Sequence, residues 1–410
     1  MKATINIIRV IVGVLFIFSG LVKANDPHGL SYKMQEFFEI WQLGQFNDWS
    51  LILSVLMNAF EIIAGFALLL GWRIKLVGWL LLLLIVFFTF LTGYTYITGK
   101  PKNCGCFGDC LLISSRTSFL KDVALTILIS LLLWFRRYIK PLFSSKVNII
   151  AMLLVTVVSF GMQWYALNYL PFVDCLPFKK GANIPEKMKM PADAIPDSTV
   201  ITFVYEKAGQ QVEFTADNFP ADFSADTYKF ISRYDKVVKE GKNNEPPIKG
   251  FSLSGITNQD STQFVLEQPY TVLVFCENFS TPFATWKNDF EKIYAAAKEK
   301  NIPVYAITSS MEESMKNFNP YTGVQVLKCD YTAIRTAARV NPTVYLLEKG
   351  MIVDKYGYRQ FNKIIPVITG VPAQKPVVTD RIDSVLHATR DSVNRFDSLV
   401  NEKMDSIKNN

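Results

Sequence analysis

Five long apolar stretches in the first 170 residues constrain the fold of this chain more than any other feature. Each is close to the roughly 20 residues that an α-helix needs to cross the hydrocarbon core of a bilayer. Because half of all residues are hydrophobic and most of that excess falls here, the sequence predicts a bundle of membrane-spanning helices. A cleavable signal peptide is the alternative for the first stretch, but no small-residue cleavage site follows it. The stretches occupy residues 5–22, 51–70, 74–97, 119–135 and 147–169.

The segment between the first and second stretches has a different pattern. Residues 31–43 (SYKMQEFFEIWQL) place their apolar side chains at helical spacing, with polar side chains between them. This pattern is typical of an amphipathic helix that lies in the membrane interface. We therefore expect contact with membrane lipid both here and along the five stretches.

The short loops between the stretches indicate an orientation. Most of their basic residues fall on one side of the membrane if the N-terminus is cytoplasmic, in agreement with the positive-inside rule. Five crossings then place the loop near residue 105 and everything after residue 170 outside the cytoplasm, where disulfides persist. We expect a protein of the inner membrane of a diderm bacterium, with its C-terminal domain in the periplasm. The basic residues are Lys2, Arg9, Arg73, Lys75, Arg136, Arg137, Lys140 and Lys146.

Charge and histidine content exclude several classes of function. The net charge of +7 has no basic stripe behind it, because the basic residues of the second half alternate with acidic ones. This distribution argues against a nucleic-acid partner. The only two histidines, His28 and His387, leave almost nothing for a histidine-rich metal site or a Ser-His-Asp triad.

Three of the six cysteines stand close together in the segment NCGCFGDC, residues 103–110. Cys104 and Cys106 are separated by one glycine, and a disulfide across so short a loop is strained and readily reduced. Cys110 and Cys175 add two thiols on the same side of the membrane, so three pairings are open. Three roles fit this cluster: disulfide exchange by Cys104 and Cys106, structural bridging, or binding of a soft metal. Exchange is the leading hypothesis, with Cys110 and Cys175 as resolving or bridging partners and no metal.

The same loop carries a resemblance to a known family. Its run NCGCFG, with residues in and beside the first two apolar stretches, resembles the DoxX-like membrane family and its methylamine-utilisation (MauE-like) branch. The resemblance covers the chain from residue 1 to near residue 140. It implies a helical bundle related in design to quinone-linked, disulfide-forming membrane proteins, and a role in redox chemistry or disulfide maturation. A quinone is then the candidate electron acceptor. The supporting residues are Arg9, Gly13, Ser19, Gly20, Lys23, Glu61, Gly65 and Gly71.

Glu61 is a carboxylate near the middle of the second apolar stretch. A charge at that depth costs at least about 2 to 3 kcal/mol unless it is paired, neutral or hydrated. Counting at about 1.5 Å per residue places Glu61 within one helical turn of the depth of Arg9 on the first helix. Two roles stay open for Glu61: an ion pair or hydrogen bond between helices, and a proton or quinone role.

After residue 170 the composition becomes that of a soluble protein. A proline-rich connector leads to residues 199–215, whose alternation around Ala208 and Gly209 predicts a β-hairpin. Residues 248–368 then alternate strand and helix patterns, which indicates a small α/β sheet domain. Its expected strands are 270–276, 302–308 and 343–347, the last in a hairpin with 352–354, and its expected helix is 283–300.

This α/β unit resembles the thioredoxin-like domains of membrane-tethered reductases. The resemblance rests on residues 251–253, Asp260, 272–275, 280–283 and 341–343, in that order. Where that family has Cys-x-x-Cys, this chain has Ser280 and Phe283, and a serine hydroxyl cannot replace a thiolate in disulfide exchange. Pro342, at the position of the family's cis-proline, implies a peptide-accepting edge. We therefore expect a binding module without catalysis, in which Ser280, Phe283 and Pro342 contact a partner.

Two cysteines remain in this unit. Cys276 ends an expected strand, and Cys329 follows another apolar run. Both fit small core residues, and the sharper alternative is a displaced redox pair.

These observations predict a multi-domain membrane protein with an all-α bundle of five transmembrane helices and an extracytoplasmic α/β thioredoxin-like domain. The expected function is thiol-disulfide chemistry in the maturation of envelope proteins, with a periplasmic client or partner protein. The alternative is a redox-silent scaffold or assembly subunit of a cell-envelope complex, joined through the C-terminal helix. The expected parts are the bundle (1–170), a connector with the hairpin (171–247), the domain lacking CxxC (248–370), and a linker with an amphipathic helix (371–410).

Overall fold

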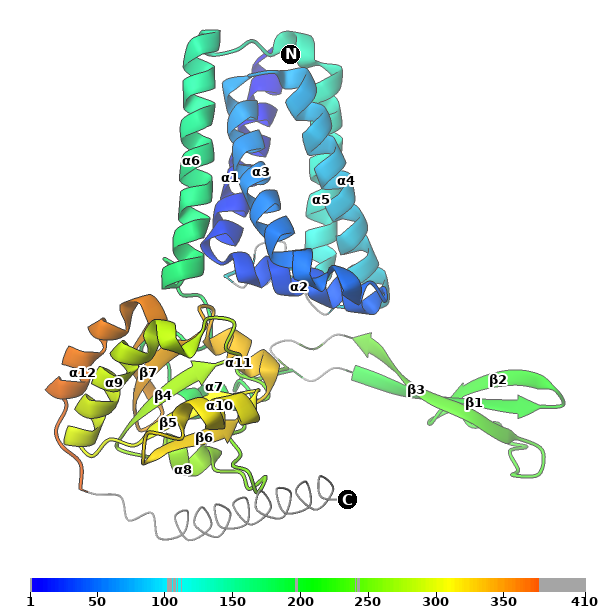
Figure 1. The fold of residues 1–410 in the computed structure, drawn as a ribbon. Coiled ribbons are helices and arrows are strands. Elements are labelled where there is room, and N and C mark those ends of the chain that lie inside the picture. The colour runs from blue at the N-terminus through cyan, green and yellow to red at the C-terminus, as the bar shows by residue number, and fades with distance from the viewer. Residues whose placement is uncertain are drawn as a thin grey trace, which may run out of the picture.

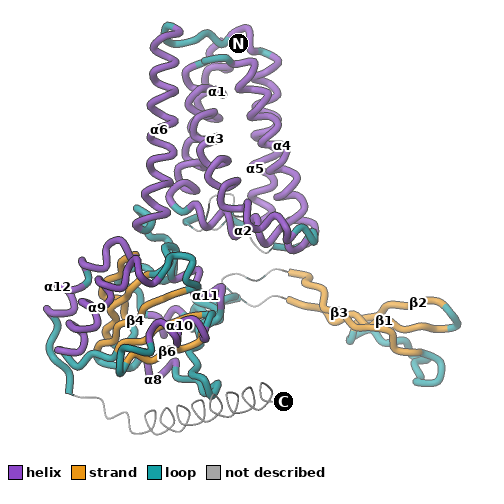
Figure 2. The backbone as a smooth tube through the Cα atoms, viewed as in Figure 1, coloured by secondary structure: helices purple, strands orange, loops and turns teal. Residues whose placement is uncertain are grey.

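The computed structural model describes residues 2–101, 105, 108, 110–111, 113–195, 198–239, 241 and 244–375, and only the backbone of 236–239. Cys104, Cys106 and the expected C-terminal helix lie outside the described residues. The chain forms a helical bundle and an α/β unit, from which a slender β-arm projects (Figure 1). Among the described residues, strands occur in the α/β unit and the arm, whereas the bundle consists of helices joined by loops (Figure 2).

Five helices of the bundle are long and apolar enough to cross a membrane, as the sequence predicts. Large apolar side chains such as Leu83, Trp134 and Val157 are exposed on their outer faces. Apolar surface of this extent on a helical bundle fits contact with lipid. The helices are α1 (Lys2–Asn25), α3 (Ser50–Leu70), α4 (Ile74–Thr98), α5 (Ser115–Trp134) and α6 (Ser145–Tyr169), with the short η2 (Arg136–Tyr138) after α5.

Glycines bring α1 and α3 into close contact. A Cβ added at Gly65 of α3 would lie 2.9 Å from the carbonyl oxygen of Gly13, and one at Gly20 of α1 would lie 3.1 Å from the carbonyl oxygen of Asn58. Small residues at such positions let two helix backbones approach, which is a common basis of helix association in a bilayer. The pair formed by α1 and α3 stands beside a second pair, α4 and α5 (Figure 1).

α2 (Pro27–Ile40) lies across the end of the bundle opposite the N-terminus (Figure 1) and is followed by η1 (Gly44–Trp49). Asp26 caps α2, because its carboxylate accepts a hydrogen bond from the backbone N–H of Gly29 at 3.3 Å. Phe37 on the inner face is buried, with its ring 5.4 Å from Trp41 and 6.5 Å from Tyr94 of α4. The helix expected at 31–43 is therefore present, and it covers one mouth of the bundle.

The α/β unit is built on a five-stranded sheet of order β6-β5-β4-β7-β8. Three strands, β4, β5 and β6, run parallel, whereas β7 and β8 are antiparallel to their neighbours. The predicted strands and the final hairpin are confirmed, and β6 is a strand that the sequence did not indicate. The strands are β4 (Tyr270–Cys276), β5 (Val304–Thr308), β6 (Val324–Lys328), β7 (Thr343–Glu348) and β8 (Met351–Gly357).

Each face of this sheet has its own hydrophobic core. Leu273 and Phe275 of β4 face one core with α8 and α11, and Val272 and Val274 face the other with α9 and α12. The connector contributes to the first core through Phe178 and α7, which the sequence did not indicate. The helices are α7 (Ile184–Lys187), α8 (Thr262–Leu266), α9 (Phe283–Glu299), α10 (Met311–Phe318), α11 (Tyr331–Ala337), η3 (Tyr358–Lys363) and α12 (Ile365–Gly370).

The β-arm is a separate antiparallel sheet of order β2-β1-β3, formed by β1 (Ser198–Lys207), β2 (Gln210–Thr215) and β3 (Lys229–Lys239). The hairpin of β1 and β2 is the predicted one, and it turns at Ala208 and Gly209, both with positive φ. The Tyr205 ring packs 5.1 Å from Phe214 and 5.2 Å from Phe223. This aromatic cluster gives the arm a small core of its own.

Substitution of Gly65 by valine should destabilise the bundle, because the new side chain would force apart the backbones of α1 and α3. Overpacking of this kind costs about 1 to 3 kcal/mol, so the thermal midpoint in lipid nanodiscs should fall by several degrees. Gly161→Val is the matched control, because nothing lies within 4 Å of a Cβ at Gly161 of α6. Equal losses in the two variants would contradict close glycine packing as the reason.

Candidate functional site

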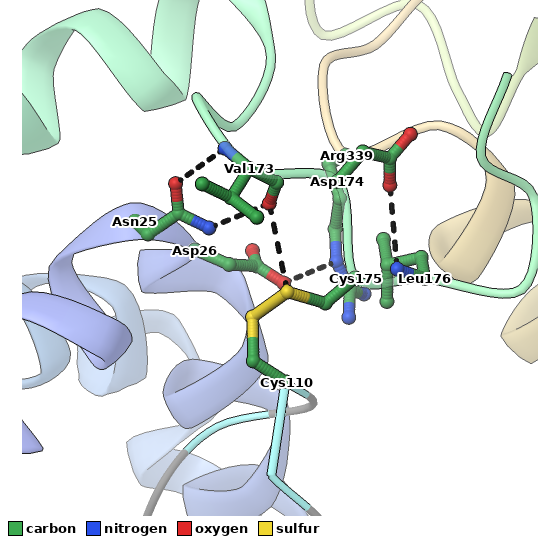
Figure 3. Close-up of a disulfide and its surroundings, with 8 residues drawn as sticks. All are labelled: Asn25, Asp26, Cys110, Val173, Asp174, Cys175, Leu176 and Arg339. Carbon is green, nitrogen blue, oxygen red and sulfur yellow. Dashed lines mark hydrogen bonds and ion pairs between the residues drawn. A yellow bond between two sulfur atoms is a disulfide. The ribbon is translucent and has the colours of Figure 1, made fainter.

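A disulfide joins Cys110, in the segment between α4 and α5, to Cys175, just after α6 (Figure 3). The bridge selects one of the pairings that the sequence left open. Beside it, the side chain of Asn25 at the end of α1 donates to the Val173 carbonyl at 2.8 Å and accepts from the Val173 N–H at 3.0 Å. Three segments far apart in the sequence are thus held together at one end of the bundle.

The loop that contains Cys104 and Cys106 can be placed through two glycines, although both cysteines lie outside the described residues. Gly105 and Gly108 have φ values of +67° and +58°, in the left-handed region that favours glycine, and the N–H of Gly108 donates to the carbonyl of Gly105 at 3.0 Å. A Cβ at Gly105 would lie 2.7 Å from Cγ of Lys33 on α2. This thiol loop, residues 103–108, therefore has its central glycine against α2.

Four ionisable side chains gather inside the bundle near this loop. Lys23 of α1 is paired with Glu61 of α3, and both are at most 2% exposed. On α5, Lys121 contacts Asp122 at 2.8 Å, and the Thr92 hydroxyl donates to Asp122 at 3.1 Å. We call Lys23, Glu61, Lys121 and Asp122 the charge cluster. Charges this deep in a membrane-spanning bundle are costly unless paired, and they commonly mark functional sites.

The charge cluster lines a cavity between the two helix pairs. The cavity is small, with a volume of about 30 Å³, which is room for a water molecule. Apolar side chains form the rest of the wall, and the Phe88 ring lies 4.8 Å from the ammonium group of Lys23. One carboxylate oxygen of Glu61 has no hydrogen-bond partner among the described residues. Polar groups that converge on a space of this size can be bridged by water. The apolar lining comprises Leu15, Phe16, Ile85, Phe88 and Leu125.

Glu61 is not at the depth of Arg9, as the count along the sequence suggested. Arg9 lies beside Gly71, ten residues beyond Glu61 on α3, and donates to the Lys140 carbonyl at 3.4 Å. At about 1.5 Å per residue this separates the two groups by about 15 Å. The count failed because it assumed that the two apolar stretches are centred at the same depth, whereas Gly13 in the middle of α1 packs against Gly65 and Leu69 of α3. Asp122, an acidic residue inside the fourth apolar stretch, could have indicated this site from the sequence but was not among the predicted residues.

The charge cluster lies next to the thiol loop. Val22, the neighbour of Lys23, lies 3.9 Å from the position that a Cβ would take at Gly108. Gly108 of the loop therefore lies beside the end of α1, where Val22 is followed by Lys23 of the charge cluster. A group that reacts at the loop and a group bound in the cavity would share one mouth of the bundle.

Charged contacts hold the α/β unit against the same mouth. Arg339, just after α11, is paired with Asp26 at 2.8 Å, and Arg335 of α11 donates to Gln35 of α2 at 2.8 Å. Both guanidinium groups lie over the Tyr32 ring, at 4.5 Å for Arg335 and 5.1 Å for Arg339. We call this set the α2–α11 contact. Figure 3 shows its Asp26–Arg339 pair close to the disulfide.

The residues predicted to bind a partner occupy different environments. Ser280 is exposed, and Phe283 at the start of α9 is half-buried with its ring 4.5 Å from Trp286. Pro342 is buried, and the Asn341–Pro342 peptide bond is cis, as expected. Glu277, at the same end of β4, binds Arg335 at 2.9 Å and so faces the α2–α11 contact. This edge is thus turned toward the chain's own bundle, and binding of a partner there stays a prediction.

The two cysteines of the α/β unit do not form a redox pair. Cys276 belongs to the core on one face of the sheet and Cys329 to the core on the other. Burial raises the pKa of the Cys276 thiol well above its usual value and that of Cys329 to about 12, so neither is a thiolate near neutral pH. Within the described residues, no group of three or more His, Cys, Asp or Glu is placed to hold a metal ion.

His28 makes the α2–α11 contact sensitive to pH. Burial, with the positive charges of Arg339 and Arg335 outweighing the attraction of Glu277, lowers its pKa from 6.5 to about 4. An unfolded chain binds a proton at His28 below about pH 6.5, whereas the folded chain does not until about pH 4. The stability that neutral His28 supports is therefore lost progressively as pH falls through that window.

We expect the thermal midpoint of the wild-type protein to fall more between pH 7 and pH 5 than that of His28→Gln, which has no group to protonate at this position. Thermal unfolding of both proteins in nanodiscs at the two pH values measures the difference. The same pH dependence in both would exclude His28 as its source.

Comparison with known proteins agrees with part of this description. The sequence model of the family Methylamine utilisation protein MauE matches residues 1–135. A second one, a domain of unknown function called DUF8463, matches residues 199–240, the β-arm. No curated protein matches the chain. Its N-terminal third is therefore a MauE-like membrane part, which carries the charge cluster and the thiol loop.

Proposed function

We propose that this protein exchanges thiols and disulfides through Cys104 and Cys106, in the maturation of proteins of the bacterial envelope. The main support for the proposal is that the other four cysteines are either bonded to each other or buried. Two of them form a structural disulfide, and two are buried with raised pKa values. The Cys104–Cys106 pair is what remains, and its described neighbours Gly105 and Gly108 lie at the mouth of the bundle. The MauE-like part fits a membrane protein of a maturation or utilisation system.

The reaction balances as follows. A thiolate of the client attacks the Cys104–Cys106 disulfide, one of the two thiols leaves, and the client's second thiolate then resolves the mixed disulfide. The client becomes a disulfide, and Cys104 and Cys106 become thiols. Two electrons and two protons must then leave the loop, and a quinone that becomes a quinol accepts both. The cavity of about 30 Å³ has room for water but not for a quinone ring, so Lys23 and Glu61 would serve this step as proton carriers rather than as the quinone site.

The proposed location is the bacterial inner membrane, with the loop and the α/β unit in the periplasm. The loop, α2 and the α/β unit lie at the same end of the bundle, opposite the N-terminus (Figure 1). Arginines and lysines of the short loops fall at the N-terminal end, where Arg9 meets Lys140. We assign a thioredoxin-like fold to the α/β unit and a DoxX-like design to the bundle. In this proposal the exposed Ser280 is the residue of that edge best placed to meet a client.

A second candidate is a redox-silent assembly subunit of a cell-envelope complex. Two observations favour it: the helix that would carry Cys-x-x-Cys begins at Phe283 without a cysteine, and the Cys110–Cys175 bridge joins two segments as a structural staple does. The two candidates differ in one respect, which is whether Cys104 and Cys106 form covalent intermediates with other proteins.

Single variants Cys104→Ala and Cys106→Ala should each accumulate a mixed disulfide with a client, because the remaining thiolate can attack the disulfide of an oxidised client, the reverse of the proposed step, and no neighbouring loop thiol is left to resolve the adduct. Non-reducing gels of membranes should show adducts that disappear with reductant. Cys329→Ala is the control and should behave as the wild type, since that thiol is buried and protonated. Absence of adducts in both loop variants would favour the scaffold.

Glu61→Gln should slow the reoxidation of reduced protein by a quinone by about 100-fold, if the carboxylate moves protons for the acceptor. The variant keeps a polar side chain of the same size at this position. Arg9→Gln is the matched control, as it removes another buried charge at the opposite end of α1. Stopped-flow measurements on folded protein in nanodiscs give the rates. A Glu61→Gln protein that is only less stable, with normal rates, would leave the ion pair a structural role.

A further inference from the structure

The β-arm leaves one long strand edge unpaired. β3 spans 11 residues at the side of the sheet, and among the described strands it pairs only with β1. The arm projects away from the bundle and the rest of the α/β unit, so no other described element runs beside it (Figure 1). An open edge presents a row of backbone N–H and C=O groups that can pair with another strand.

The side chains of β3 are engaged only in part within the arm. The Phe230 ring lies 5.5 Å from Tyr205, and the Tyr234 hydroxyl donates to Glu213 at 2.7 Å, yet Phe230 and Tyr234 are 59% and 42% exposed. Natural edges are usually protected by charge, proline, a bulge or a short strand. The pairing of β3 with β1 has two register shifts, which leave residues 232–237 as the regular stretch of the edge. The described charges of this stretch are Arg233 and Asp235, each 56% exposed.

We propose that β3 pairs antiparallel with β3 of a second copy of this chain, centred on Tyr234, to form a continuous six-stranded sheet. In this register Arg233 of each copy stands directly opposite Asp235 of the other. Each charge then has an opposite partner both along its own strand, at 3.9 Å, and across the interface. Two copies of the edge related by a two-fold axis at residue 234 thus present opposite charges to each other. A two-fold symmetric dimer requires such a self-complementary surface.

Neighbouring registers are worse. A two-fold axis moved by one residue to position 233 would place Arg233 opposite its own copy, and one at position 235 would do the same for Asp235. Like charges directly opposite each other in a sheet are repulsive. Within residues 232–236 the charge pattern therefore favours this register. Lys229 and Lys239, which the same register would place opposite each other, lie beyond the two register shifts of β3.

Membrane anchoring favours the same occupant. Two copies held in one bilayer have already lost much of the translational and rotational freedom that association otherwise removes. Backbone hydrogen bonds and the apolar side chains would supply most of the attraction, and the exposed ion pairs would supply specificity.

Charge variants of the full chain in nanodiscs or mild detergent test the register. Arg233→Asp and Asp235→Arg should each raise the dimer dissociation constant about tenfold or more, since each change creates two like-charge pairs across the interface. Mixing the two variant proteins should restore association, because every cross-strand pair is then of opposite charge. Neither variant chain has an Arg–Asp pair within its own strand, so rescue on mixing can come only from pairs between the two chains. Light scattering or mass photometry measures the populations.

Gln211→Glu is the matched control, because it alters charge on the exposed strand at the other edge of the arm and should leave the dimer unchanged. A Tyr234→Cys protein should also form an oxidant-dependent cross-link beyond the wild-type background, since opposed residues lie within disulfide reach. A protein that is monomeric at all concentrations, or a dimer unaffected by either charge variant, would overturn the proposal. So would equal effects of both variants without rescue on mixing.

Discussion

The α2–α11 contact determines how the two halves of the protein meet. Arg339 is almost completely buried and is paired with Asp26, the residue that caps α2. A buried charge that loses its partner costs about 3 to 5 kcal/mol, so the pair is held in one arrangement. Because α2 rests on the bundle and Arg339 follows α11, which belongs to a sheet core, this ion pair joins the bundle to the α/β unit.

Three features lie between the α2–α11 contact and the interior of the bundle. The Cys110–Cys175 disulfide lies beside it, the thiol loop has its central glycine against α2, and the charge cluster lies next to the end of α1. The end of α1 contacts both of its neighbours. Asn25 is hydrogen-bonded to Val173 after α6, and Val22 lies next to Gly108 of the thiol loop.

The sequence predicted helices and strands that follow from a pattern within one segment. It did not predict contacts between segments that are far apart in the chain. Apolar stretches of the right length gave all five helices, and alternation gave the first hairpin of the arm, because both follow from periodicity. Cys110 and Cys175 are 65 residues apart, and spacing could not pair them. The partner of Glu61 was missed because the position of Lys23 at the end of an apolar stretch hides how far its stem reaches. β3 and α11 were missed because their polar residues obscure the period.

The end of β4 explains why the proposed chemistry is assigned to another part of the chain. Disulfide exchange needs two cysteines that a substrate can reach. At this end of β4 Glu277 binds Arg335, Pro342 is buried, and Ser280 and Phe283 stand where the sequence comparison would require cysteines. The end is turned toward the membrane part and contributes to the α2–α11 contact. In the proposed reaction the chemistry therefore takes place at the thiol loop.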